Sequence, residues 1–153
     1  RVTNLPVKNP CGPGLYADGR QGTKLELNSV TTGECGSNGV VVHSGARLVA
    51  TECQFHRNGC FGVSVHTSSA RLTSCTSHHN KKSGVWAYGR STVVDLMGEG
   101  TSVHDNEEHG LYSEWGGTIT VHYPCVLDDV SYENKGRDIV GTVEQEAHKK
   151  LVH

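Results

Sequence analysis

The sequence predicts an all-β fold, a right-handed parallel β-helix solenoid of about five coils, each of 22–26 residues with three short strands. Two markers that repeat in phase and a strand-type alternation of apolar residues support this prediction. The first marker is a glycine that opens an apolar strand, at Gly14, Gly39, Gly62, Gly84 and Gly110. A repeat of this length is typical of solenoids, in which each unit stacks on its neighbours.

The second marker is an asparagine four residues before the next glycine, at Asn58, Asn80 and Asn106. Cys35 takes this place before Gly39, and Asn134 ends the unit that follows Gly110. Stacked asparagines can join successive coils by a ladder of amide hydrogen bonds. We expect Gly136 to open a sixth, partial unit, and each recurring glycine to supply a positive φ angle at its turn.

Apolar residues alternate after each glycine, as in Val40 and Val42 or Val63 and Val65. A period of two indicates a β-strand and places alternate side chains on opposite faces. A second short strand follows the first, and a third ends at the asparagine. Because every unit repeats this order, equivalent strands must stack in parallel, about 4.8 Å apart, and equivalent side chains form columns.

The pattern N-x-x-x-G-[V/L]-x-[V/A], repeated about every 23 residues, resembles the right-handed β-helix repeats of the pectate-lyase-like superfamily. It is most similar to the carbohydrate-binding and sugar-hydrolase type of repeat, which also occurs in β-helix F-box proteins. The resemblance covers roughly residues 9–140. It implies the fold and no single activity, because the superfamily hosts many functions.

We expect the β-helix to cover residues 1–142, with partial coils at both ends. Residues 1–9 read as the last part of a coil, which suits a fragment of a longer protein. No cap is recognised at this end, so the open edge would allow end-to-end self-association. Residues 143–153 are polar and favour helix, which predicts a C-terminal tail or cap.

Composition excludes several classes of partner. The net charge of −2 leaves no broad basic field for a nucleic acid, and no apolar stretch approaches the length of a membrane span. The six cysteines form no CxxC pair, which disfavours a zinc ribbon. Cys53 and Cys75 share an inward repeat position, so we expect reduced core thiols and an intracellular or virus-encoded protein. No cofactor is expected.

The first strand of each coil turns two columns of side chains outward. One column contains Tyr16, Trp86 and Tyr112, and the next contains Asp18, His43, His66, Tyr88 and Glu114. Aromatic planes suit the apolar faces of sugars, histidine and carboxylate groups can bind sugar hydroxyls, and tryptophan and tyrosine also favour protein interfaces. We therefore expect a non-catalytic recognition solenoid for a glycan or a protein partner. The simpler alternative is that these aromatic residues merely suit β-strands.

A further column contains His56, His78 and His104, each two residues before its asparagine, and Tyr132 continues it. Imidazoles at coil spacing could share a metal ion or take part in catalysis. However, the first and third Cα atoms would lie nearly 10 Å apart, at roughly twice the coil spacing. We therefore expect a structural histidine stack with no metal.

Two other functions are kept as alternatives. A carbohydrate-active enzyme (a polysaccharide lyase, an epimerase or a hydrolase) needs a base and often calcium, usually in a groove walled by long loops. The short coils leave little room for such loops, although Arg47 and Arg71, each in an Ala-Arg-Leu motif, are expected to align and could meet anionic sugars. A structural or assembly spacer would instead present a featureless surface.

Overall fold

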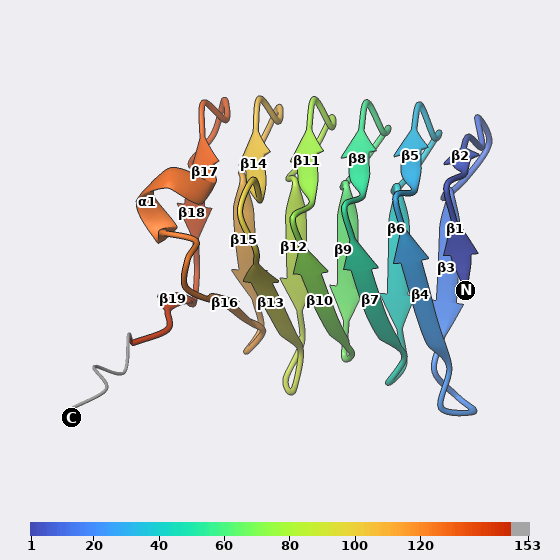
Figure 1. The fold of residues 1–153 in the computed structure, drawn as a ribbon, viewed down its shortest axis with the longest axis horizontal. Helices are drawn as coiled ribbons and strands as arrows, with labels where there is room; N and C mark the ends of the chain where they lie inside the picture. The colour runs from blue at the N-terminus through green and yellow to red at the C-terminus, as the bar shows by residue number, and fades with distance from the viewer. Residues whose placement is uncertain (148–153) are drawn as a thin grey trace.

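The computed structural model describes residues 1–147, which form a β-solenoid with three parallel sheets (Figure 1). Successive coils lie side by side along the long axis, and each complete coil gives one strand to each sheet. The predicted architecture of three strands per coil is therefore confirmed. We name the sheets by the order in which a coil visits them after its glycine.

The first sheet consists of β3 (Leu15–Asp18), β6 (Val40–His43), β9 (Val63–His66), β12 (Val85–Tyr88), β15 (Leu111–Glu114) and β18 (Ile139–Val140). The second sheet consists of β1 (Val2–Thr3), β4 (Lys24–Asn28), β7 (Arg47–Thr51), β10 (Ser69–Thr73), β13 (Val93–Met97), β16 (Thr118–Val121) and β19 (Val143–Gln145). The third sheet consists of β2 (Pro6–Val7), β5 (Thr31–Gly33), β8 (Gln54–His56), β11 (Thr76–His78), β14 (Ser102–His104) and β17 (Ser131–Tyr132).

The first and last described residues extend these sheets. Strands β1 and β2 pair with β4 and β5, so residues 1–7 form the second and third sides of a coil. Val143–Gln145 was expected to belong to a helical tail or cap, but it forms β19 and pairs with β16. The rest of that prediction falls on residues 148–153, which lie outside the described residues. Among the described residues, no helix is long and apolar enough to cross a membrane.

The core is built from inward columns, as the alternation predicts. Val40, Val63, Val85 and Leu111 lie in register on the first sheet and are all 0% exposed. The second sheet adds leucines such as Leu72, and the third adds Phe55. Cys53 and Cys75 are buried among these side chains as free thiols.

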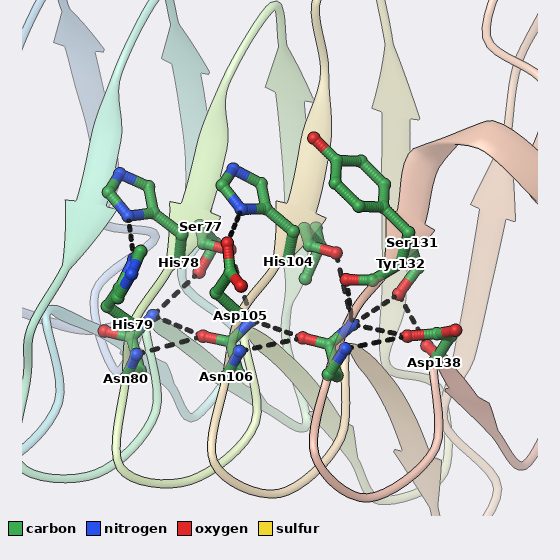
Figure 2. A network of polar contacts seen from close by, with 12 residues as sticks. Ser77, His78, His79, Asn80, His104, Asp105, Asn106, Ser131, Tyr132 and Asp138 are labelled. Carbon is green, nitrogen blue, oxygen red and sulfur yellow. Dashed lines mark hydrogen bonds and ion pairs between the residues drawn. The ribbon is translucent and has the colours of Figure 1, made fainter.

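An asparagine ladder joins the coils at the turn that follows the third sheet (Figure 2). The Nδ2 group of each asparagine donates to Oδ1 of the next: Asn58 to Asn80 over 2.9 Å, Asn80 to Asn106 over 3.0 Å, and Asn106 to Asn134 over 2.9 Å. Each backbone N–H donates to the same oxygen. Because the first three side chains are fully buried, these bonds satisfy groups that water cannot reach.

The recurring glycine serves a purpose different from the one that its position suggested. Gly39, Gly62 and Gly84 do not have positive φ angles, so that prediction is wrong. A Cβ on Gly62 would lie 2.8 Å from Nδ2 of Asn80 and 2.7 Å from the carbonyl oxygen of Gly84. Glycine is therefore required because the next coil approaches closely. The left-handed conformation falls on the residue that precedes the asparagine column, at Glu34, Arg57, His79, Asp105 and Glu133.

The glycine column ends at Asp138, not at the expected Gly136. Leu111 pairs with Ile139, so Asp138 lies beside Gly110. Its Oδ1 atom accepts hydrogen bonds from the backbone N–H and Nδ2 of Asn134, at 3.1 and 2.8 Å (Figure 2). The carboxylate thus takes the role that the next asparagine has for Asn58, Asn80 and Asn106.

Substitutions of different ladder residues should lower the free energy of unfolding by very different amounts. In Asn80→Ala, buried groups of Asn58 and Asn106 lose a partner, so the free energy of unfolding should fall by about 3 kcal/mol. Asp138→Asn keeps an accepting oxygen and should cost less than about 1 kcal/mol. Urea unfolding followed by circular dichroism measures both. Equal losses would contradict the role of the buried amide bonds in joining successive coils.

Candidate functional site

The outward face of the first sheet brings the predicted columns together. Strand registers align Tyr16, Val41, Ser64, Trp86 and Tyr112 in one row, and Asp18, His43, His66, Tyr88 and Glu114 in the next. Ser64 differs from its neighbours because its small side chain is buried, although its row faces outward. The aromatic residues therefore concentrate in the coils that contain β12 and β15.

Four rings form an aromatic cluster on this face: Phe61, Trp86, Tyr88 and Trp115. The rings of Phe61 and Trp86 stack with their centroids 4.6 Å apart. Trp86 and Tyr88 are 5.1 Å apart, and Tyr88 and Trp115 are 6.5 Å apart. Sequence reasoning did not find Phe61 or Trp115, because both lie in turns and outside the strand alternation on which it relied.

Trp115 is the most exposed member of the cluster, with 72% of its surface accessible. Its φ angle of 53° lies in the left-handed region, which is costly for a bulky side chain. The residue directly after the aligned strand is small in the three preceding coils, at Ser44, Thr67 and Gly89. A large aromatic residue at a position of small ones was a signal that the sequence could have provided.

The two carboxylates of the second row are both held in place. Glu114 accepts a hydrogen bond from Nε1 of Trp86 at 3.1 Å, and burial together with the hydrogen bond to Glu114 raises the pKa of Tyr112. Asp18 is bound by Nε and Nη2 of Arg20, at 2.9 and 2.7 Å, and these hydrogen bonds lower the pKa of Asp18. Glu114 is therefore a fixed acceptor beside aromatic rings.

Imidazoles extend the same row towards the N-terminal coils. His43 and His66 stack at 4.6 Å, and His66 and Tyr88 stack at 4.7 Å. Burial lowers the pKa of His66, and the neighbouring His43 adds to this effect. Within the described residues, Nδ1 of His66 is buried without a hydrogen-bond partner. The stack places flat rings in a continuous row beside the aromatic cluster.

The predicted histidine column on the third sheet forms a ring stack. The rings of His56, His78, His104 and Tyr132 follow one another at 5.3, 5.1 and 5.0 Å, each within 8° of parallel. Parallel rings cannot turn their nitrogen atoms towards one ion. Among residues 1–147, no group of three or more histidine, cysteine, aspartate or glutamate side chains could hold a metal.

Burial and neighbouring side chains in the ring stack determine the pKa of His78. Nδ1 of His78 lies 2.8 Å from Nδ1 of His79, and Nδ1 of His104 lies 2.7 Å from Oδ2 of Asp105 (Figure 2). Burial lowers the pKa of His78 to about 4, helped by the neighbouring imidazoles of His104 and His56. At neutral pH, His78 is thus an uncharged stacking group.

The expected alignment of Arg47 with Arg71 is wrong. Arg47 pairs with Ser69, whereas Arg71 pairs with Val49 and Asp95. The turn after His66 is one residue shorter than the turn after His43, while the Ala-Arg-Leu motif lies one residue later. The two arginines therefore occupy different columns and do not form a paired site.

Comparison with known proteins settles the family. A family model described as "Right handed beta helix region" matches residues 1–144. The chain belongs to this right-handed β-helix family. The match confirms the resemblance predicted from the repeat. Searches of curated proteins and of solved structures found no match to this β-helix.

Acid should destabilise the β-helix through the ring stack. A histidine whose pKa is lowered by folding binds fewer protons folded than unfolded, so its contribution is full above pH 6.5 and is lost as pH falls towards 4. His78→Phe keeps a stacking ring without a titratable group. Its melting temperature should therefore fall between pH 7 and pH 4.5 by at least about 2 °C less than that of the parent. Identical slopes would disprove the contribution of His78.

Proposed function

We propose that this β-helix is a non-catalytic recognition module that binds a glycan or a protein partner on the outward face of its first sheet. The observation that carries the proposal is the exposed, left-handed Trp115 at the edge of the aromatic cluster. The left-handed backbone is common to this corner of the coil, since Ser44, Thr67 and Gly89 also have positive φ angles. The large ring is peculiar to Trp115, and because packing gains little from a ring that is mostly in water, a binding role gives a reason for it.

The chemistry around the aromatic cluster suits a sugar ring. Exposed ring planes can cover the apolar face of a saccharide, while Glu114 is fixed as a hydrogen-bond acceptor by Trp86 and Tyr112. His43 and His66 supply further polar edges in the same row. Because the strands and stacked neighbours already hold these groups, little conformational entropy would be lost on binding.

The positions and hydrogen bonds of the Asp18 and Glu114 carboxylates favour recognition over the alternative of a carbohydrate-active enzyme. Glycoside hydrolysis uses two carboxyl groups about 5–9.5 Å apart. Asp18 and Glu114 occupy the same row at opposite ends, separated by His43, His66 and Tyr88. Each is bound by other side chains of its own coil or of the adjacent coil.

The deciding experiment is a glycan array that includes uronic-acid polymers, with any hit followed for product formation. Binding without turnover would support recognition of a glycan, and turnover would support the enzyme. A blank array, followed by capture of a protein whose binding requires the aromatic cluster, would identify the protein alternative. A surface that binds neither would leave the structural spacer.

Trp115→Gly should separate binding from stability. Glycine relieves the left-handed backbone, so the melting temperature should stay the same or rise. Loss of about 60 Å² of apolar ring contact should weaken binding of the array ligand roughly tenfold. Isothermal titration and thermal unfolding measure the two effects. Tyr123→Ala is the matched control, because Tyr123 is 65% exposed but lies outside the first sheet. Unchanged affinity in Trp115→Gly would refute the assignment.

A further inference from the structure

The ring stack of the third sheet has an open end at the N-terminal coil. Gly33 pairs with His56, so the column continues into a residue without a side chain. A hollow lies at this place, lined by Pro6, Val7, Lys8, Thr31, Gly33, Glu34 and His56. One boundary of the hollow is therefore the imidazole of His56, whose other neighbour in the stack is His78.

We propose that this hollow binds a phenol ring, which stacks on His56 and extends the column by one ring. The site lies on the third sheet and is separate from the aromatic cluster of the first. Its occupant is either a small phenolic molecule or the side chain of a tyrosine in a peptide.

The opposite end of the same column indicates the type of ring. There the phenol of Tyr132 stacks on the imidazole of His104 with centroids 5.0 Å apart and planes 3° apart. Coil spacing is set by the strand ladder and is the same at both ends. An imidazole that ends the column therefore offers a phenol the same stacking geometry. Burial and the nearby Arg57 lower the pKa of His56, so this ring is neutral when it stacks.

The walls of the hollow suit an aromatic ring with one polar group. Pro6, Val7 and Thr31 provide carbon-rich sides, and Pro6 and Thr31 are neighbours in the strand register. At the rim, Lys8 and Glu34 form an ion pair between exposed side chains. A phenol hydroxyl can donate to the Glu34 carboxylate or accept from the Lys8 ammonium group, which gives the ring an orientation.

Glycine at position 33 keeps the end of the column open. A Cβ on Gly33 would lie 2.9 Å from both Cε1 and Nε2 of His56. Contacts this short force the imidazole to move, so Gly33→Ala would disturb the stacking surface and reduce the hollow. This substitution tests the site from inside the column, and Pro6→Asp tests it from the exposed wall.

The experiment is a titration with 4-ethylphenol and with N-acetyl-tyrosinamide, followed by carbon–proton NMR of the histidine Cε1–H groups. The His56 signal is assigned by its disappearance in His56→Gln. We expect an upfield ring-current shift of this signal, saturating with a dissociation constant of about 1 mM. Cyclohexanol, which is not planar, should produce no such shift. Equal affinity for both phenols indicates a small molecule as the occupant, and tighter binding of the amide indicates a tyrosine.

Gly33→Ala should weaken binding at least fivefold, while Tyr132→Phe, at the far end of the stack, should leave it unchanged. If Gly33→Ala fails to fold, Pro6→Asp provides the same test at an exposed residue. The proposal is overturned by a His56 signal that does not move at 20 mM probe (about twenty times the expected dissociation constant). An equal shift of the His56 signal with cyclohexanol also overturns the proposal. So does undiminished affinity for the phenols in Gly33→Ala, or in Pro6→Asp if Gly33→Ala does not fold.

Discussion

The contact between each asparagine and the glycine of the preceding coil determines the geometry of the whole solenoid. The amide nitrogen of Asn80 lies only 2.8 Å from the place that a Cβ on Gly62 would take, and the amide nitrogen of Asn106 lies 2.7 Å from the corresponding place on Gly84. The buried amide is satisfied only if the next coil arrives at hydrogen-bonding distance. The coils are thus held in one register, and every column inherits that register.

One register imposes the same stacking on the core and on the surface. Inward valines meet valines, and on the two outward faces imidazoles and aromatic rings are brought to about 5 Å from their equivalents. A ring stack is therefore an expected product of repetition and is weak evidence of function by itself. The column of His78 and His104 is of this kind, since its polar atoms find local partners.

Trp115 differs from such a column because repetition does not explain it. The backbone is left-handed at this corner in the preceding coils as well, at Ser44, Thr67 and Gly89, but those residues are small. The tryptophan instead adds a large exposed ring that fills no space in the core. Its contact with Tyr88 links it to a cluster whose other members are held by stacking and by Glu114. A large exposed ring that departs from the repeat is a better guide to a binding face than the regular columns are.

The same distinction explains which features the sequence could predict. The spacing of Gly62 and Asn80 and the alternation of valines are properties of every coil, so the repeat revealed the sheets, the ladder and the outward rows. Features of a single turn were not accessible in this way. The two-residue offset between Arg47 and Arg71 depends on a turn that is one residue shorter and a motif that lies one residue later, and Trp115 lies outside the strand pattern.

The glycines were found but their role was misassigned, because a glycine in a turn suggests a positive φ angle. Close approach of a neighbouring coil also requires glycine, and only the three-dimensional arrangement distinguishes the two causes.

The direction of the hydrogen bonds explains why Asp138 suits the glycine position that follows Asn134. Each asparagine both donates and accepts, so the ladder has a direction, and a group that only accepts can stand at its C-terminal end alone.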